Sequence, residues 1–293
     1  MNHMVRIFLA VIICLLGANP KANAQNPFLT QVDYIWLFDV SPDGKYLAYK
    51  QWNKDKMSKI VVKNLSSQKE FVVDSTEMSG NAPTEASHGL TFLPDGQLLF
   101  EKQGNLLAYS PSTQTCSEMV RQATISPAPL LHMSATRQTV YLAGMHTLAC
   151  MDLGKGSKKQ IETGKQDGNI ISLSATPGGN AIYSTTYTEA GKTQARIWQW
   201  NASLAKPADV TARFEKLVAA PYLIEAASQE GTFIVAGREG VFRVNTETEE
   251  TTRLMDNLSE NPVSKIHFDE QSHVLYYLLL RDSGQIHQCE VHN

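Results

Sequence analysis

The sequence predicts an all-β protein, for three reasons. Short runs such as "KYLAYKQW" and "GVFRVNT" mix apolar and polar residues with the two-residue period of β-strands. Turn signals separate these runs, beginning with Ser41-Pro42-Asp43-Gly44, where Pro and Gly preset the backbone for reversal and Asp accepts hydrogen bonds from neighbouring amides. No segment after the first 24 residues shows the period of an amphipathic helix.

The turn signals recur at nearly regular intervals. The fourth residue of each turn falls at positions 44, 96, 137, 179, 231 and 272, so the intervals are 52, 41, 42, 52 and 41 residues. Repeats of this length, each with several short strands, are typical of β-propeller blades, in which neighbouring blades cover both faces of every sheet. The alternative is a β-sandwich whose turns are alike by chance, and the regular spacing favours the propeller.

Each turn is followed by strand runs in a fixed order. The second strand of each blade is predicted directly after its turn, at 45–52, 97–102, 138–144, 180–187, 232–237 and 273–281. The third strands are predicted at 58–65, 105–111, 147–153, 195–201, 240–246 and 285–291. The run "YIWLFDV" at 34–40 precedes the first turn and is expected to be the innermost strand of the first blade.

The two ends of the chain are predicted to share the last blade. After Ser272 only two strand runs fit before Asn293, so the last blade lacks its outermost strand. The segment from Asn26 to Asp33 is expected to supply it, which removes the open edge at which a ring could unzip or aggregate. We therefore predict a six-bladed β-propeller of four-stranded antiparallel blades, with the last blade completed by the N-terminal strand.

Two of the repeats resemble a known family. "VSPDGKYLAY" (40–49) and "FLPDGQLLF" (92–100) are similar to the repeat of TolB-type and WD40-like (PD40) propellers, also found in the propeller domains of prolyl oligopeptidase-family enzymes. The resemblance spans nearly the whole chain after the N-terminal segment, while repeats three to six keep the spacing and lose Asp-Gly. It implies the fold and is nearly silent on function, because propellers host many unrelated activities.

The first 24 residues have the features of a secretory signal peptide. Arg6 supplies a positive charge, residues 7–16 form a short apolar stretch, and Ala22-Asn23-Ala24 has the small-x-small form of a cleavage site. The apolar stretch is too short to span a bilayer comfortably, and the alternative is an N-terminal membrane anchor. We expect residues 25–293 to form a single exported domain, periplasmic or secreted, with no transmembrane segment after cleavage.

Charge and cysteine content exclude some classes of protein. The net charge is −3 and no basic cluster stands out, so we expect no nucleic-acid partner. After the signal segment the chain contains Cys116, Cys150 and Cys289, an odd number without a CxxC pair, which argues against a disulfide framework and against a zinc site. The sequence allows either one disulfide bond among these cysteines or three free thiols.

The resemblance also implies which face meets a partner. In such propellers the SPDG-like turns lie on one face, so Pro42, Asp43 and Gly44 are expected to be structural. The loops between second and third strands, and those between blades, lie on the other face around the central channel. The two long intervals place extra residues at 75–88 and 201–222, in blades one and four, and we expect them to form opposing walls of a groove over the channel mouth.

Five residues in these loops are candidate binding residues. Trp52 could stack on a sugar or a peptide, or pack against a neighbouring blade. His88 and His146 could make polar contacts, or be ordinary surface histidines. Arg238 could anchor a carboxylate, or form an exposed ion pair with the adjacent Glu239. Tyr222 ends the second long insertion and completes the set.

No motif in the sequence indicates a catalytic site. A serine hydrolase needs a nucleophile on a sharp strand-to-helix turn, and no G-x-S-x-G occurs. We therefore expect no catalytic residue, no metal ion and no cofactor, and a TolB-like propeller that binds a protein or peptide through its loop face. TolB-type proteins carry an additional α/β domain before the propeller, so their specific partners are not transferred. The alternatives are a carbohydrate-binding propeller, or a metal-dependent lyase or hydrolase with several ligands converging at the channel mouth.

Overall fold

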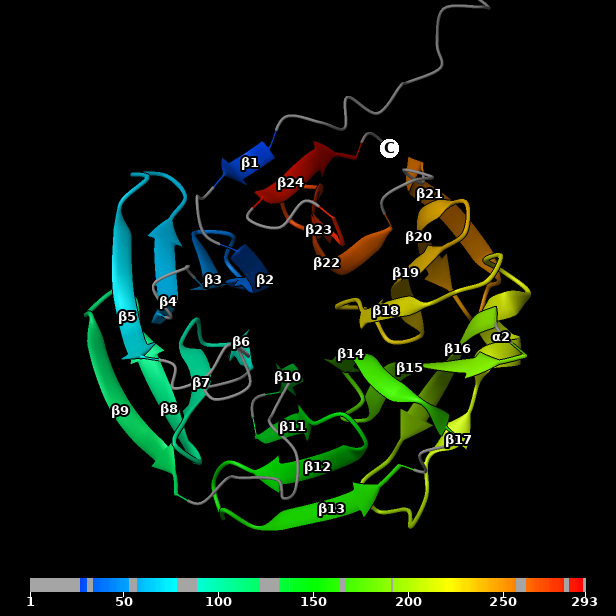
Figure 1. Ribbon diagram of the computed structural model, residues 1–293, viewed down its shortest axis with the longest axis horizontal. Helices are drawn as coiled ribbons and strands as arrows, with labels where there is room; N and C mark the ends of the chain where they lie inside the picture. The colour runs from blue at the N-terminus through cyan, green and yellow to red at the C-terminus, as the bar shows by residue number, and fades with distance from the viewer. Residues whose placement is uncertain are drawn as a thin grey trace, which may run out of the picture.

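Six four-stranded antiparallel sheets surround a central axis in the computed structural model (Figure 1). The structure describes residues 27–30, 34–52, 57–77, 89–121, 132–136, 138–163, 167–190, 192–256, 262–281 and 285–291. Each sheet is one blade, with its first strand beside the axis and its last strand at the rim. The predicted all-β, six-bladed propeller is confirmed.

The first three blades follow one another along the chain. Blade one contains β2 (Tyr34–Val40), β3 (Tyr46–Trp52), β4 (Met57–Asn64) and β5 (Glu70–Glu77). Blade two contains β6 (Leu90–Phe92), β7 (Leu98–Lys102), β8 (Asn105–Ser110) and β9 (Thr115–Val120). Blade three contains β10 (His132–Ala135), β11 (Thr139–Ala143), β12 (Thr147–Asp152) and β13 (Lys158–Glu162).

The last three blades complete the ring. Blade four contains β14 (Asn169–Ala175), β15 (Ala181–Glu189), β16 (Lys192–Trp200) and β17 (Ala208–Asp209). Blade five contains β18 (Leu223–Ala226), β19 (Thr232–Gly237), β20 (Gly240–Asn245) and β21 (Glu250–Asp256). Blade six contains β22 (Val263–Asp269), β23 (Val274–Leu279) and β24 (Gln285–Glu290), and its outer strand is β1 (Pro27–Thr30) from the start of the chain.

Strand β1 closes the ring by pairing antiparallel with β24. Leu29 lies opposite Ile286, and both side chains are buried in a cluster that also contains Phe38 and Tyr49 of blade one. The clasp predicted near residues 26–33 is therefore confirmed for Pro27–Thr30, and the remaining residues of that segment lie outside the described residues. Because β1 covers the edge of β24, the last blade has the same four strands as the others.

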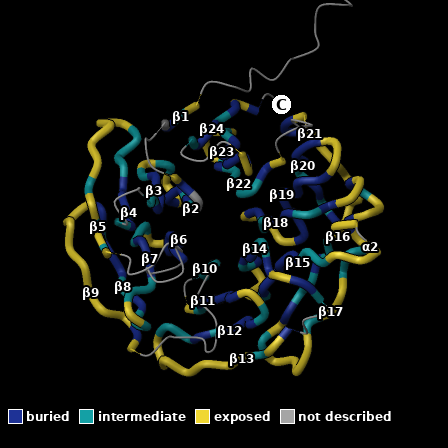
Figure 2. Tube along the Cα trace, viewed as in Figure 1, coloured by how far each residue is buried: buried dark blue, intermediate teal, exposed yellow. Residues whose placement is uncertain are grey.

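The hydrophobic core is divided among the blade interfaces. Each of six apolar clusters lies between two neighbouring blades, so every sheet is covered on both faces. Figure 2 shows the consequence: burial is greatest in second strands such as β7, β11 and β19, while much of the outer strands β5, β9 and β13 is exposed. The three described cysteines contribute no crosslink, because Cys116, Cys150 and Cys289 are all free thiols.

The SPDG-like turns make structural contacts on their own face. The Ser41 hydroxyl donates to the Asp43 carboxylate over 2.7 Å, and Gly44 adopts a φ of +65° in this turn. A Cβ at Gly44 would lie 2.9 Å from the Asp269 carboxylate in the turn of blade six. Between blades four and five, the Gly178 amide donates to the Glu230 carboxylate over 2.6 Å. These contacts agree with the structural role expected for the turn residues.

One short helix departs from the sequence-based expectation. Helix α2 (Thr211–Glu215) lies in the second long insertion, where a loop was expected. Its five residues are too few to display a helical period in the sequence, and Phe214 is its one buried side chain. Among the described residues, no helix has the length and apolar character needed to cross a bilayer.

Shortening Leu29 to Ala should destabilise the ring at its clasp. The substitution leaves a cavity between β1 and blade one, which typically costs about 2–5 kcal/mol of unfolding free energy. Urea unfolding followed by tryptophan fluorescence measures this loss.

The control is Val72→Ala on the rim strand β5, where the side chain is 61% exposed. Its unfolding free energy should change by no more than about 0.5 kcal/mol. Equal stabilities for Leu29→Ala and the wild type would show that β1 does not hold the ring closed.

Candidate functional site

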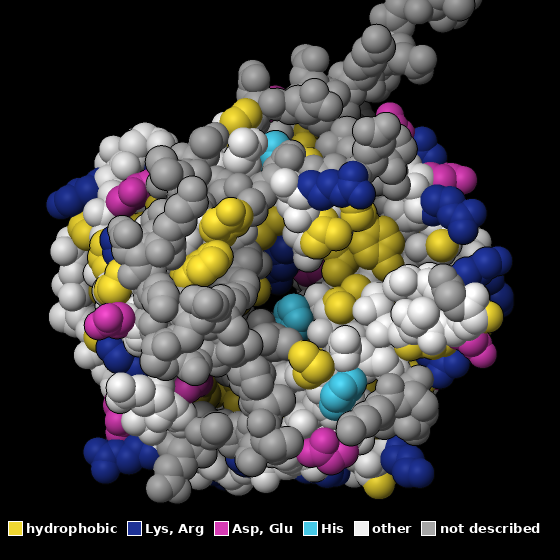
Figure 3. All heavy atoms as spheres, in the orientation of Figure 1, with side chains coloured by type: hydrophobic (Ala, Val, Ile, Leu, Met, Phe, Trp, Pro, Cys, Tyr) yellow, Lys and Arg dark blue, Asp and Glu magenta, His cyan; other side chains and the backbone are white. Residues whose placement is uncertain are grey.

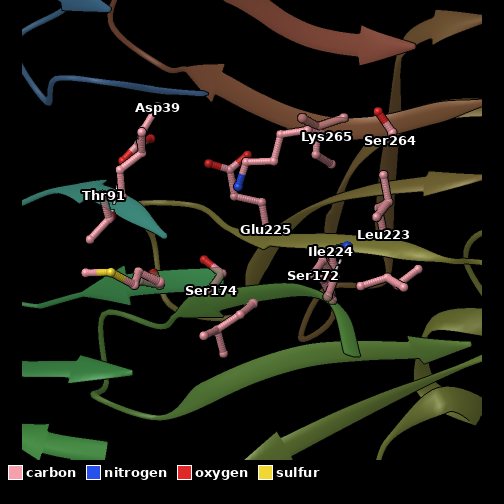
Figure 4. Close-up of a pocket in the computed structure, with 15 residues that line it drawn as sticks. Asp39, Thr91, Ser172, Ser174, Leu223, Ile224, Glu225, Ser264 and Lys265 are labelled. Carbon is pink, nitrogen blue, oxygen red and sulfur yellow. Dashed lines mark hydrogen bonds between the residues drawn. The ribbon is translucent and has the colours of Figure 1, made fainter. Parts of the chain in front are cut away.

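A narrow channel runs along the axis between the six inner strands. Its enclosed part has a volume of about 50 Å³, and polar side chains from several blades line it. Figure 4 shows Asp39, Glu225 and Lys265 extending into this space from β2, β18 and β22, with Ser174 of β14 nearby. The channel therefore contains ionisable groups close to the axis.

Side chains of one inner strand accept hydrogen bonds from backbone amides of the inner strand in the next blade. Asp39 accepts hydrogen bonds from the Phe92 amide over 2.7 Å and from the Thr91 hydroxyl over 3.1 Å. In blade four, Ser174 accepts a hydrogen bond from the Ala226 amide over 3.0 Å. Inner strands of neighbouring blades do not pair with each other, so such contacts occupy backbone groups that would otherwise need water.

His267 joins three blades at the axis. Its Nδ1 lies 2.8 Å from Glu225 Oε1 and 3.4 Å from Asp39 Oδ1, which connects blade six to blades five and one. Burial favours the neutral imidazole, but the two carboxylates outweigh burial and the nearby Lys265, and raise the pKa of His267 to about 9. At neutral pH the ring is therefore an imidazolium held between two carboxylates.

This cluster fits a structural role better than acid–base catalysis. A general base needs a pKa near the working pH and a free position beside its substrate. The proton of His267 is held too tightly for that role, and Asp39 is already occupied by Thr91 and Phe92. Within the described ranges, no group of three or more His, Cys, Asp or Glu side chains is arranged to hold a metal ion.

A broader groove opens on the loop face, lined mostly by blades four to six and also by His132 of blade three. Its volume is about 900 Å³, and Ile171, Leu223 and Ser264 line both the groove and the channel, so the two spaces adjoin. Figure 3 shows apolar side chains gathered around the central opening on this face. The groove is lined by His132, Ile170, Ile171, Thr186, Lys192, Thr193, Gln194, Ala195, Glu215, Ala220, Pro221, Tyr222, Leu223, Arg238, Pro262, Val263, Ser264 and Leu280.

The second long insertion builds one wall of this groove. Phe214 and Val218 are buried between blades four and five, and the Phe214 ring meets Phe233 edge-on with a centroid distance of 5.2 Å. Beyond this anchor, the Ala219 carbonyl accepts a hydrogen bond from the Arg238 amide over 2.8 Å. The insertion is therefore fixed to the β19–β20 turn.

Gly237 allows this close contact. A Cβ at this position would lie 2.4 Å from Val218 Cγ1 and 2.7 Å from the Ala219 carbonyl oxygen, so no larger residue fits without displacing the insertion. One residue earlier, the Ala236 carbonyl accepts a hydrogen bond from the Tyr222 amide over 2.8 Å. These contacts place Tyr222 and Arg238 at the groove wall.

Two of the five candidate residues thus share one site. Tyr222 and Arg238 both line the groove, on the face that the sequence predicted. Burial raises the pKa of Tyr222 despite a hydrogen bond with the Val263 backbone, so its hydroxyl stays neutral at physiological pH. Arg238 is exposed, and the adjacent Glu239 lies 3.4 Å from Arg253.

Two of the other candidates, Trp52 and His146, are not among the residues that line the groove. Trp52, at the end of β3, packs against Tyr34 with a centroid distance of 5.3 Å. The His146 ring lies 3.2 Å from the Gly168 carbonyl of the next blade. His88 and the adjoining residues 78–87 lie outside the described residues, so the prediction of two opposing walls stays open while the wall from 201–222 is seen in part.

The axial residues and His132 were not among the candidates. Asp39, Glu225 and His267 each lie on a first strand, two or three residues before the turn of their blade. An ionisable residue at that position is the signal that could have identified them. His132 begins β10 and lines the groove; burial, with the nearby Lys265, lowers its pKa to about 3, so it is neutral at physiological pH.

Comparisons with known proteins support the fold. No known family profile and no curated protein sequence matches the chain. A chain from the crystal structure of the mitotic checkpoint complex matches 88% of this chain and 75% of its own length, with a TM-score of 0.57 at 14% identity. An oligogalacturonate lyase in complex with manganese matches 92% of this chain and 96% of its own length, with a TM-score of 0.56 at 10% identity. At such identities the likeness concerns the fold alone.

Replacing His267 by Gln should lower the unfolding free energy more at low pH than at high pH. A histidine whose pKa rises from 6.5 to about 9 on folding stabilises the protein fully below pH 6.5, and this contribution disappears as the pH rises through 9. The variant should therefore lose up to roughly 3 kcal/mol near pH 6 and progressively less toward pH 10, as urea unfolding across this range can measure.

The control for this variant is His273→Gln, at an exposed position in the turn of blade six. An exposed substitution of this kind should change the unfolding free energy by no more than about 0.5 kcal/mol. A pH-independent difference for His267→Gln would mean that the imidazole is not charged in the folded protein.

Replacing Gly237 by Ala should displace the groove wall. Overpacking against Val218 and the Ala219 carbonyl should lower the unfolding free energy by about 1–3 kcal/mol. Amide hydrogen exchange should show faster exchange at Arg238 and Tyr222, whose amides are bonded across this contact.

Gly154→Ala is the matched substitution, since its Cβ would approach the Asp152 carboxylate no closer than 3.4 Å. It should leave exchange at Arg238 and Tyr222 unchanged. If Gly237→Ala did the same, the insertion would not be fixed by this contact.

Proposed function

We propose that the chain is an exported, non-catalytic β-propeller of the TolB type, which binds a protein or peptide partner through the groove on its loop face. The observation that carries this proposal is the groove itself, with its volume of about 900 Å³ and its predominantly apolar lining. Concave apolar sites with a few polar groups are where proteins usually bind their ligands.

Exposed apolar side chains support a protein partner. Leu280 is 65% exposed at the groove, and Met145 and Tyr34 are 43% and 41% exposed on the same face. Apolar groups gathered around a cavity favour association, since binding removes them from water.

The lining favours a peptide over a sugar. Among the described lining residues, Tyr222 is the one Phe, Tyr or Trp, and the other apolar residues are aliphatic or proline. Such walls suit aliphatic side chains and extended backbone. A partner-binding role is also consistent with the axial cluster, whose carboxylates hold the His267 imidazolium and leave little capacity for proton transfer.

Export is proposed from the N-terminal segment. Residues 1–24 combine a basic start, a short apolar stretch and a small-x-small sequence, as secretory signals do. The TolB type is proposed from the repeats at 40–49 and 92–100. A periplasmic or secreted partner is therefore the one to seek.

A capture experiment tests the proposal. Residues 25–293 are immobilised and exposed to an envelope extract, and bound proteins are identified by mass spectrometry. Leu280→Asp places a charge at the apolar rim of the groove and should weaken capture of the specific partner about tenfold or more, because the charge must be desolvated on binding.

Leu204→Asp is the matched control. Leu204 is also an exposed leucine, but it lies near the opposite face. It closely follows Trp200, which pairs with Ala181 beside the turn of blade four. It should capture the partner as the wild type does, and affinities for the purified partner then quantify the difference. The proposal would be overturned in favour of a metalloenzyme if Leu280→Asp lost no captured protein and the wild type degraded a polysaccharide in a reaction that a chelator abolishes.

A further inference from the structure

We infer that the groove selects an extended peptide segment in which apolar residues are accompanied by a carboxylate, bound beside Lys192 and Arg238. This inference rests on the proposed function and adds the chemistry of the partner. It follows from the charge of the lining, the shape of the apolar wall and the rigidity of the positions that carry the charges.

The groove is more basic than the chain as a whole. Three of its described lining residues are charged at neutral pH: Lys192, Arg238 and Glu215. His132 adds no charge, because its pKa is about 3. These described lining residues therefore carry a net charge of about +1 in a protein whose net charge is −3, which favours an anionic ligand group at this place.

The channel beneath the groove does not alter this balance. Asp39 and Glu225 contribute two negative charges, and His267 and Lys265 contribute two positive charges, with the imidazolium held directly between the carboxylates. An anionic ligand group is consequently directed to the rim, where the Lys192 and Arg238 side chains are exposed.

The two cations stand on well-ordered elements. Arg238 lies in the turn between β19 and β20, and its amide donates a hydrogen bond to the Ala219 carbonyl. Lys192 begins β16 and lies opposite Glu189 of β15. An arginine guanidinium can bind a carboxylate with two parallel hydrogen bonds. Because the Arg238 amide is already bonded, only side-chain freedom is lost when this contact forms.

Apolar residues of the groove suit the remainder of the segment. Pro221, Tyr222 and Val263 line the wall next to the exposed Leu280, and the volume of about 900 Å³ exceeds that of a single side chain. A short extended segment can place aliphatic groups here while its carboxylate reaches the basic rim. A carboxylate could come from an Asp or Glu side chain or from a chain terminus, and both sources present the same group.

Selection from random peptides tests this inference. Residues 25–293 are used to select from two phage libraries of twelve-residue peptides, one with free C-termini and one with C-termini fused to the coat protein. The expected result is enrichment of peptides that combine aliphatic residues with Asp or Glu, or with a free C-terminus. The double variant Lys192→Glu/Arg238→Glu should lose these peptides and enrich Lys or Arg instead.

A control with the same change of charge is placed on the turn face. Lys45 and Lys155 lie in the first turn of blade one and in the β12–β13 turn, and the variant Lys45→Glu/Lys155→Glu should enrich the same peptides as the wild type.

A synthetic copy of the best peptide should lose about fivefold in affinity when its carboxylate is replaced by an amide or when Arg238 becomes Gln. Circular dichroism melts confirm that the variants are folded.

The outcomes separate the inference from the proposed function. Apolar peptides without a preferred charge, bound equally by the charge-reversed variant, would overturn the inference and leave the proposed function intact. Failure to enrich any peptide from either library would overturn both. Binding of polygalacturonate that Lys192→Glu/Arg238→Glu abolishes, without binding of peptides, would overturn both in favour of an acidic polysaccharide as the ligand.

Discussion

Closure of the ring is the constraint on which the rest of the structure depends. A four-stranded sheet has two faces, and here each face is covered only by the neighbouring blade, so an open ring would expose two apolar faces to water. The pairing of β1 with β24 prevents this at the seam between blades six and one. The contact of His267 with Asp39 crosses the same seam beside the axis.

The two faces of the closed ring have different roles. On the turn face, neighbouring blades are joined by specific contacts, such as Glu230 with the Gly178 amide and Gln271 with the Pro42 carbonyl. On the loop face, the β15–β16 and β19–β20 turns and the second insertion border the groove. Contacts between neighbouring turns thus support the wheel on one face, while the insertion adds a wall to a groove on the other.

The second insertion links the core to the groove. Phe214 and Val218 belong to the cluster between blades four and five, whereas Tyr222, a few residues later, lines the groove. A wall anchored in the core is already ordered before a ligand arrives, which lowers the entropic cost of binding. This continuity is the physical basis on which we propose the groove, rather than the axial charges, as the site of recognition.

The sequence by itself determined the all-β class, six repeats, the strand positions and the closing segment. These properties follow from neighbouring residues: the two-residue alternation and turns such as Ser41 to Gly44 are local signals. It also indicated the loop face, and with it Tyr222 and Arg238, which the structure brings into one groove. Only the tertiary structure decided that Asp39, Glu225 and His267 meet at the axis. Residues so far apart in the chain come together only through blade number and register, which no local pattern encodes.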